Sequence, residues 1–361
     1  KRSEGTIVVT NDGASILDAM QIDHPIASRI VDLAAGQEDT AGDGTTTAVV
    51  LAGQLLHEAA NLLDVGLHQT SITRGYWLAA ERAREVLRDV AVDVAPDDDE
   101  RLGTVARTAI TGKWADGQKH LLSAIAVQAA RSIADGRTVD LDDVYVRTAP
   151  GNGVEQSTLV EGLVIDLDRS SSSVSDVDPR LPDRIEDATI AFVDYEITVD
   201  KAKATSHYTI RHPDSHGTIV DHEDALFDGF VEHLRDLDVD VLFCQKSIND
   251  SLKTRLAGAG VYAVERTRQD EISNLARITR GELAFDVDEL APSYLGRAGL
   301  IEQETIGGKE FLSVTACPGG TPVSILLRGA TPHVLDELER IMDDCLRVVE
   351  ATVEDGYVVP G

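Results

Sequence analysis

The sequence has few cysteines and no long apolar segment, and both shortages exclude classes of protein. Cys244, Cys317 and Cys345 are the only three cysteines in 361 residues, and they lie far apart without the spacing of a metal site. We therefore expect reduced core residues rather than a disulfide framework. No apolar run is long enough to cross a membrane, and no secretory signal opens the chain.

Cations are also scarce. Lys and Arg together number 33 against 63 Asp and Glu, which gives a formal net charge of −30. The acidic residues are spread along the whole chain, and Arg is much commoner than Lys among the cations. Such a surface argues against nucleic acid or a membrane as a partner. It suits a protein that stays hydrated in concentrated salt, so we expect a cytoplasmic protein of a salt-rich cell.

The length and the first residues bound the organisation. A chain of 361 residues can form two or three domains, and a hydrophobic content of 42% is ordinary for a globular protein. The sequence begins at Lys1 rather than Met, and a strand is predicted almost at once, over residues 6–10. These features suggest a fragment or a trimmed start.

The most informative stretch covers residues 42–53, where Gly42-Asp43-Gly44-Thr45-Thr46-Thr47 precedes a segment with helical spacing of apolar residues. The threonines lie where the helix begins, and unpaired N–H groups there favour an anion. Asp43 would repel a bare phosphate, but Mg²⁺ between the two resolves the conflict. The stretch therefore suggests a nucleotide-phosphate site. Local physics alone favours a plainer interpretation, in which Gly-Asp-Gly is a tight turn and the threonines cap the helix.

The remaining pattern divides into helical and mixed parts. Helices are predicted after His24-Pro25 and over residues 14–20, 71–90, 100–110, 118–134, 223–237, 248–257, 270–279 and 332–352. Strands are predicted over residues 144–147, 163–165, 189–193, 239–244, 261–264, 283–285 and 323–329. The alternation between residues 174 and 317 indicates an α/β domain with a partly parallel sheet.

Six segments together resemble the group II chaperonins, the archaeal thermosome family. They are residues 10–14, 42–53, 75–81, 243–246, 326–329 and 333–359, and they occur in the family's order over essentially the whole chain. The resemblance implies a multidomain α and α/β subunit: a helical equatorial part over residues 1–97, a mixed intermediate domain over 98–166, an α/β apical domain over 167–320, and an intermediate return segment over 321–361.

The resemblance also implies the site residues. Asp43 corresponds to the Mg²⁺ ligand beside the phosphates of ATP, and Gly42, Gly44, Thr45, Thr46 and Thr47 complete the nucleotide-binding stretch. Asp12 corresponds to a carboxylate that helps to position the attacking water, and Asp344 to the intermediate-domain aspartate that orients this water on closure. K⁺ is a further candidate ion. The plain alternative for Asp344 is a solvated helix residue, because Asp343 beside it could equally face solvent.

Two departures from the family concern the nucleotide site. The family's Gly-Pro-Lys-Gly phosphate loop precedes the first strand found here, and its second equatorial half follows the Val-Val-Pro-Gly at the end of this chain. We therefore expect an incomplete pocket and an exposed apolar face on the equatorial helices. The family's lysine near residues 147–153 is not evident, and Arg147 is a candidate replacement.

The apical region is long enough for a helical protrusion, which the polar stretch over residues 207–230 would form. His212 and His216 are four residues apart, but Pro213 and Gly217 favour a solvated loop over a metal site. Leu226, Phe227 and Phe230 could contact a client, although a small helical core is the favoured interpretation.

Two function classes follow. The first is an ATP-hydrolysing chaperonin subunit that encloses unfolded polypeptide in a double ring of identical or homologous subunits. The second is a truncated or decayed paralogue that binds polypeptide without ATP. The ATP-hydrolysing class is favoured by the presence of all three aspartates, Asp12, Asp43 and Asp344. The class without ATP is favoured by the absence of the family's phosphate loop and second equatorial half from this sequence.

Overall fold

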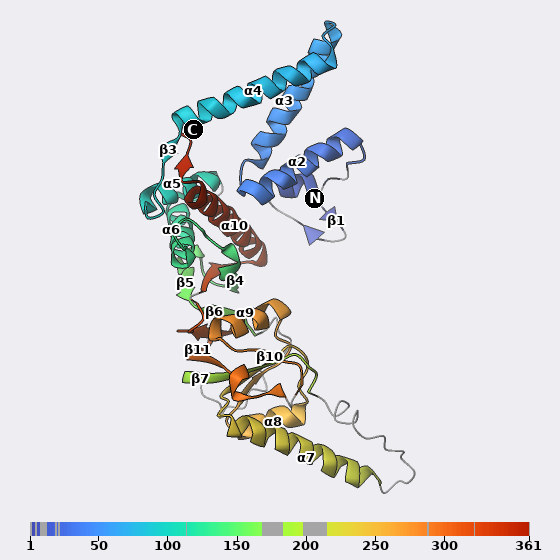
Figure 1. Ribbon diagram of the computed structural model, residues 1–361, viewed down its shortest axis with the longest axis vertical. Coiled ribbons are helices and arrows are strands. Elements are labelled where there is room, and N and C mark those ends of the chain that lie inside the picture. The colour runs from blue at the N-terminus through green and yellow to red at the C-terminus, as the bar shows by residue number, and fades with distance from the viewer. Residues whose placement is uncertain are drawn as a thin grey trace. The chain divides into compact units, whose positions relative to one another are not determined.

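The computed structural model describes residues 2–3, 6–7, 13–18, 20, 22–112, 114–167, 183–197, 215–286, 289–320 and 322–360. The chain forms two compact units (Figure 1). The first unit comprises residues 1–159 and 325–361, and the second comprises residues 160–324. The division into equatorial, intermediate and apical parts is finer than these two units and stays a prediction.

The first unit begins with helices. These are α1 (Gly13–Asp18), α2 (Pro25–Ala41), α3 (Thr45–Asp64) and α4 (Gln69–Val90), after a short pair of strands, β1 (Arg2–Ser3) and β2 (Thr6–Ile7). The His24 ring accepts the Ile26 N–H and caps α2, with Pro25 in the first turn. The Tyr76 hydroxyl donates to the Leu55 carbonyl at 2.6 Å and joins α4 to α3.

The apolar faces of α2, α3 and α4 are largely uncovered. Ile26 on α2 is 59% exposed, and Leu56 on α3 is 50% exposed. On α4 only Ile72 of the predicted face is buried, and on α2 only Ala34. The predicted helices are therefore confirmed, and so is the expected exposed apolar face.

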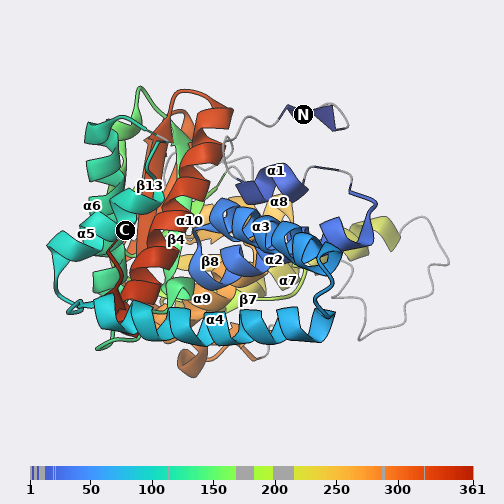
Figure 2. The same ribbon diagram turned by 90° about the horizontal axis from the view of Figure 1, so that it is seen from above.

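The core of the first unit forms around α10 (Pro332–Asp355), which packs against α5 (Asp99–Ala109) and α6 (Asp116–Ile133) (Figures 1 and 2). Thr331 caps α10 at its N-terminus, and Gly356 ends it in the left-handed conformation. Apolar residues at helical spacing form the core-facing side of α10: Leu335, Leu338, Ile341, Met342, Cys345 and Val349 are buried, and Val334 and Val348 are half-buried.

Short strands complete the first unit. A three-stranded sheet has the order β4-β13-β5, formed by β4 (Val144–Pro150), β13 (Val323–Gly329) and β5 (Thr158–Glu161). The 3-10 turns η1 (Leu141–Asp143) and η2 (Val154–Gln156) flank β4. An antiparallel pair, β3 (Val92–Asp93) and β14 (Tyr357–Val358), brings the end of the chain beside the α4–α5 connection.

A seven-stranded mixed sheet forms the second unit. Its order is β6-β12-β11-β7-β8-β9, with β10 also paired to β7. The strands are β6 (Leu163–Asp166), β7 (Arg184–Val193), β8 (Val241–Cys244), β9 (Tyr262–Val264), β10 (Leu283–Ala284), β11 (Gly296–Ile306) and β12 (Lys309–Thr315). β7, β8, β9 and β10 pair in parallel, which confirms the predicted α/β part.

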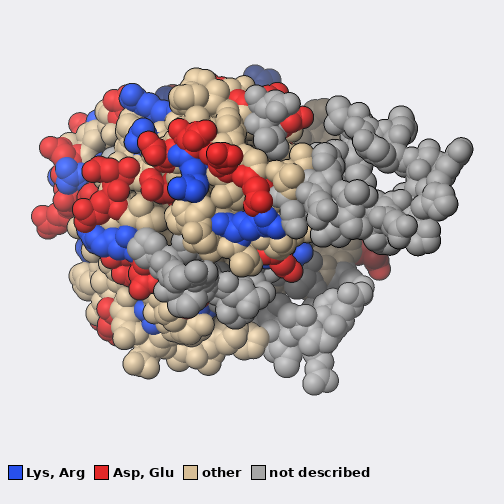
Figure 3. Space-filling model, turned by 90° about the horizontal axis from the view of Figure 1, so that it is seen from below, with Lys and Arg blue, Asp and Glu red and all other residues tan. Residues whose placement is uncertain are grey.

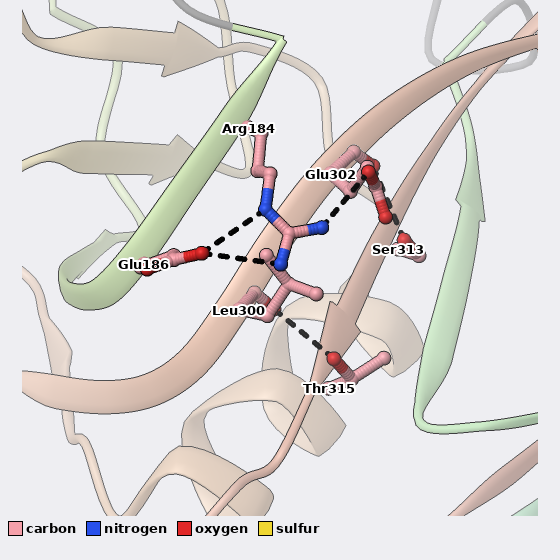
Figure 4. Close-up of polar contacts among 6 residues, drawn as sticks. All are labelled: Arg184, Glu186, Leu300, Glu302, Ser313 and Thr315. Carbon is pink, nitrogen blue, oxygen red and sulfur yellow. Dashed lines mark hydrogen bonds and ion pairs between the residues drawn. The ribbon is translucent and has the colours of Figure 1, made fainter.

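The long antiparallel hairpin of β11 and β12 was not predicted. Gly307 and Gly308 make its turn with φ of 64° and 83°, which glycine tolerates. β11 then pairs with β7. On this surface the Arg184 guanidinium bridges Glu186 and Glu302, at 3.2 Å and 3.3 Å (Figure 4).

Three helices accompany this sheet: α7 (Ser215–Asp236), α8 (Asp250–Gly258) and α9 (Gln269–Thr279), with the 3-10 turn η5 (Pro292–Tyr294). Phe227 and Phe230 of α7 lie in a hydrophobic core with Leu234, Leu252 and Leu256. The favoured interpretation of these two aromatics as core is confirmed, whereas Leu226 is exposed. His212 and the side chain of His216 lie outside the described residues.

The cysteines are free thiols, with Cys244 and Cys345 buried and Cys317 half-buried. Burial raises the pKa of the Cys317 thiol to about 11. In the part of the chain that the structure describes, no helix combines the length and the apolar character needed to cross a membrane.

Candidate functional site

The candidate site is the 42–47 loop, defined here as residues 42–47 between α2 and the first turn of α3. Gly42 has a φ of 64°, and its N–H donates to the Glu38 carbonyl at 2.9 Å, so it closes α2 as a left-handed C-cap. Gly44 has a φ of 79° and is the N-cap of α3. Asp43 is therefore held between two backbone positions that favour glycine.

The N-terminus of α3 is free of a side-chain cap. The Gly44 carbonyl accepts the Ala48 N–H at 2.9 Å, which begins the helical hydrogen bonding, and no side chain of the described residues caps the first turn. Thr45 is buried, whereas Thr46 and Thr47 are exposed. The interpretation of the threonines as the cap is therefore wrong, because they occupy the first turn itself. The first-turn N–H groups suit an anion.

Asp43 presents an accessible carboxylate at this helix end. The side chain is exposed, and its Oδ1 accepts the Gly44 N–H at 2.6 Å. The Asp43 carbonyl accepts from the Gln37 amide at 2.9 Å, which fixes the loop against α2. One hard oxygen ligand beside an anion-binding helix end fits Mg²⁺ bound to phosphate. Among the described residues there is no group of three or more His, Cys, Asp or Glu side chains that could hold a metal ion.

The start of α1 also reaches this loop. A Cβ added at Gly13 would collide with the Thr46 hydroxyl and lie 3.5 Å from the Thr45 Oγ1. Gly13 follows Asp12 in the sequence, and Asp12 itself lies outside the described residues. The role predicted for Asp12 stays a prediction.

Two neighbouring aspartates on α10 have different environments. Asp344 is 6% exposed, three residues after the buried Ile341 on the side of α10 that packs into the core. The Asp343 side chain is 52% exposed and accepts a 2.8 Å hydrogen bond from Arg347 Nε. The interpretation of Asp344 as a solvated helix residue is therefore wrong, and it describes Asp343 instead.

Arg347 links α10 to the 42–47 loop, a contact that was not predicted from the sequence. A Cβ added at Gly42 would lie 2.5 Å from the Arg347 Cβ and 2.9 Å from its Cδ, so the arginine stem crosses this glycine. The hydrogen bond to Asp343 raises the pKa of Arg347 against the opposing effect of burial, and the charges of Glu38 and Asp39 raise it further. The i, i+4 spacing of Asp343 and Arg347 indicates their own ion pair within α10 and not the contact with Gly42.

Arg147 lies on β4, where its guanidinium stands 5.8 Å from the centre of the Tyr145 ring and Nη1 donates to the Val146 carbonyl at 3.1 Å. These contacts hold the guanidinium close to its own strand. Its role as a replacement for a phosphate-sensing lysine stays a prediction.

Comparison with known proteins shows which family and which proteins this chain is similar to. A family model described as the TCP-1/cpn60 chaperonin family matches residues 1–361. Thermosome subunit alpha of Halobacterium salinarum is 40% identical over 359 residues, covering 99% of this chain and 63% of that protein. The thermosome subunit of Methanopyrus kandleri is 39% identical over 361 residues, covering 99% of this chain and 65% of that protein. This chain thus spans less than two thirds of the length of these relatives.

A solved structure gives the same likeness. The open-state monomer of a group II chaperonin from Methanococcoides burtonii is 33% identical, with a TM-score of 0.63 over 88% of this chain and 73% of that one. The likeness covers helical and mixed-sheet parts together, so it extends over most of the architecture described above.

Proposed function

This chain belongs to the TCP-1/cpn60 chaperonin family, and on that premise we propose that it is part of a group II chaperonin subunit that binds and hydrolyses Mg-ATP. The observation that carries the proposal is the 42–47 loop. There an exposed carboxylate lies between two left-handed glycines at an uncapped helix N-terminus.

The residues present fit the nucleotide and its metal. Backbone N–H groups of Thr45 and Thr46 would bind phosphate oxygens, and the Thr46 and Thr47 hydroxyls are exposed for further hydrogen bonds. The Asp43 carboxylate would hold Mg²⁺, with K⁺ a further candidate ion. When bound, the metal supplies charge neutralisation at the transferring phosphoryl group.

The chain's own residues would then position the attacking water. Phosphoryl transfer needs an aligned water and stabilised charge rather than a covalent partner. Asp344 would accept a hydrogen bond from that water and orient it, and its low exposure supports a fixed direction for the carboxylate. We propose the same kind of role for Asp12. Hydrolysis would then depend on how closely α10 approaches the 42–47 loop.

The exposed apolar surface supports association with further protein. α3 alone exposes Val50, Leu51, Leu55, Leu56 and Leu63, and α4 exposes Trp77 and Leu78. Contiguous exposed apolar residues on a protein surface often mark contacts with other proteins. We propose that they pack against other parts of a subunit or against neighbouring subunits of a ring, and that the assembly acts in the cytoplasm on unfolded polypeptide.

Hydrolysis by the protein from its complete reading frame tests the proposal. In concentrated KCl we expect Mg²⁺-dependent ATP turnover, and we expect Asp43→Ala to reduce it at least about a hundredfold through loss of the metal ligand. Asp64→Ala removes an exposed carboxylate from the far end of the same helix and should leave turnover unchanged.

Turnover in Asp43→Ala equal to that of the unmodified protein would contradict the assignment of the metal ligand. If the unmodified protein bound unfolded polypeptide but showed no Mg²⁺-dependent turnover, the proposal of an ATP-driven chaperone would be wrong. The second function class, a polypeptide-binding module without ATP, would then stand in its place.

A further inference from the structure

We propose that Arg347 is a positioning residue, which seats the 42–47 loop against the turn of α10 that carries Asp344. The proposal rests on the proposed function, because it assigns a role within the same site. Arg347 would act through the two elements that it joins, α10 and the 42–47 loop.

Shape is the first argument. Gly42 is buried, and the Cβ, Cγ and Cδ atoms of Arg347 all lie within 3.3 Å of where a Cβ on Gly42 would stand. The backbone of the loop and the arginine stem therefore fit together with no space for a side chain between them. Gly42 also needs its left-handed conformation to close α2, so both the contact and the turn depend on glycine at the same position.

Charge is the second argument. Glu38 and Asp39 at the end of α2 and Asp343 on α10 all act on the Arg347 guanidinium. Without this cation, the acidic end of α2 would face the acidic turn of α10 with less compensation, and like charges would separate the two elements. Arg347 therefore places a positive charge between the negatively charged end of α2 and the negatively charged turn of α10.

Energetics favours a positional role over a stabilising one. The Arg347 and Asp343 side chains are 36% and 52% exposed, and ion pairs of this exposure contribute little to folding. Displacement of a catalytic group by about 1 Å, in contrast, can reduce a rate about a hundredfold. A change at Arg347 should therefore affect turnover much more than stability.

Three substitutions separate the parts of this role. Arg347→Lys keeps the stem and the charge, Arg347→Met keeps most of the stem, and Arg347→Ala removes both. Arg29→Met is the matched control, since Arg29 lies on α2 in an exposed pair with Asp32 at 3.1 Å. ATP hydrolysis, nucleotide binding and the thermal midpoint of the protein from its complete reading frame are measured for each variant in the same KCl concentration.

We expect kcat to fall about tenfold or more in Arg347→Met, further in Arg347→Ala and least in Arg347→Lys. KM for ATP and the thermal midpoint should change little in Arg347→Met, and Arg29→Met should match the unmodified protein. If kcat in Arg347→Met stays within twofold of the control, or falls only in step with the thermal midpoint, the positional role is wrong.

The Asp43→Ala variant separates this failure from failure of the proposed function. Loss of turnover in Asp43→Ala with normal turnover in Arg347→Met overturns the role of Arg347 alone. Normal turnover in both variants overturns the proposed site and this inference with it. If Arg347→Ala does not fold, the comparison of Arg347→Met with Arg347→Lys decides the question.

Discussion

Carboxyl groups on α10 that look equivalent in the sequence differ in how far they are buried. Asp344 lies in the core-facing side of the helix, and Asp343 lies beside it in solvent with its arginine partner. Glu350 is half-buried further along the same helix. Burial raises the pKa of the Glu350 carboxyl, and the nearby charges of Glu354, Asp140 and Asp142 raise it further against Arg347.

Because the pKa of Glu350 is raised in the folded protein, this residue makes the stability of the fold decrease as pH rises. Because the folded pKa lies above the ordinary value of 4.5, the folded protein is destabilised as pH rises through the window above 4.5 and the carboxyl group ionises. Glu350→Gln removes this cost. We expect the variant to be more stable than the unmodified protein at pH 7, by less than about 1 kcal/mol because the group is partly screened by water.

Thermal unfolding of the two proteins over a series of pH values checks this expectation. The difference in midpoint should shrink as pH falls and disappear below pH 4.5, where the carboxyl group is protonated in both the folded and the unfolded chain. A difference that is independent of pH would show that the substitution acts through packing instead.

At the scale of secondary structure elements, close backbone approach decides how the second unit packs. Phe192 on β7 stacks on Phe243 of β8, with ring centres 5.9 Å apart. Gly281 and Gly296 leave room for the Phe192 ring, because a Cβ on either would come within 3.0 Å of it. These glycines allow β11 and the segment that follows α9 to lie close to the Phe192 ring of β7.

Substitution at this contact should destabilise the second unit. In Gly296→Ala the new methyl group meets both the Phe192 ring and the Thr279 side chain, so we expect a loss of about 1–3 kcal/mol in the free energy of unfolding. Gly229→Ala is the control, since Gly229 lies in the exposed middle of α7 with no atom within 4 Å of its Cβ position. That change should stabilise by about 0.5–1 kcal/mol.

Denaturation in urea of both variants measures the two effects. The expected result is opposite signs for the two glycines. Equal and small effects would contradict the close packing of Phe192 against β11.

The elements differ in how far the sequence could predict them. The apolar spacing of α10 agrees with its buried face, because the helix packs against α5 and α6. The spacing on α3 predicts a face that is uncovered in this chain, since amphipathic pattern shows what a helix can bury and not whether a partner is present. The β11–β12 hairpin was missed although Gly307-Gly308 is a strong turn signal, because its strands mix apolar and charged residues.

The candidate site was predicted in part. The 42–47 loop was predicted from its own residues and Asp344 from the family resemblance. The structure shows the two left-handed glycines and the burial of Asp344, and the roles of these residues stay predictions. Arg347 was missed because its contact with Gly42 joins residues about 300 positions apart in the sequence, and no local pattern reports such a contact.

At the scale of the whole molecule, the main feature is the excess of acidic over basic side chains. On the face shown in Figure 3, Asp and Glu side chains gather in several groups, with Lys and Arg side chains among them. Ion pairs such as Arg184 with Glu302 leave the net charge of −30 unchanged, because that figure already counts every Lys and Arg. The remaining repulsion is screened at high ionic strength, where the Debye length falls to about 3 Å near 1 M salt.

Stability should therefore depend on salt. We expect the thermal midpoint to fall by several degrees or more when KCl is lowered from about 2 M to about 0.1 M, because the self-repulsion of the folded state is then unscreened. Circular dichroism through the transition measures it, and sucrose at matched osmolarity is the control for solvent exclusion. A midpoint that is insensitive to KCl would contradict the assignment of the acidic surface to a salt-rich cell.

The most direct test of the central claim is single-turnover hydrolysis of ATP by Asp344→Asn, measured together with nucleotide binding in concentrated KCl. Asp336→Asn, an exposed carboxylate on the same helix, is the matched control. We predict that Asp344→Asn binds ATP with nearly normal affinity but hydrolyses it at least about a hundredfold more slowly than the unmodified protein. Asp336→Asn should bind and hydrolyse ATP normally. Hydrolysis by Asp344→Asn at the rate of the unmodified protein would contradict the account.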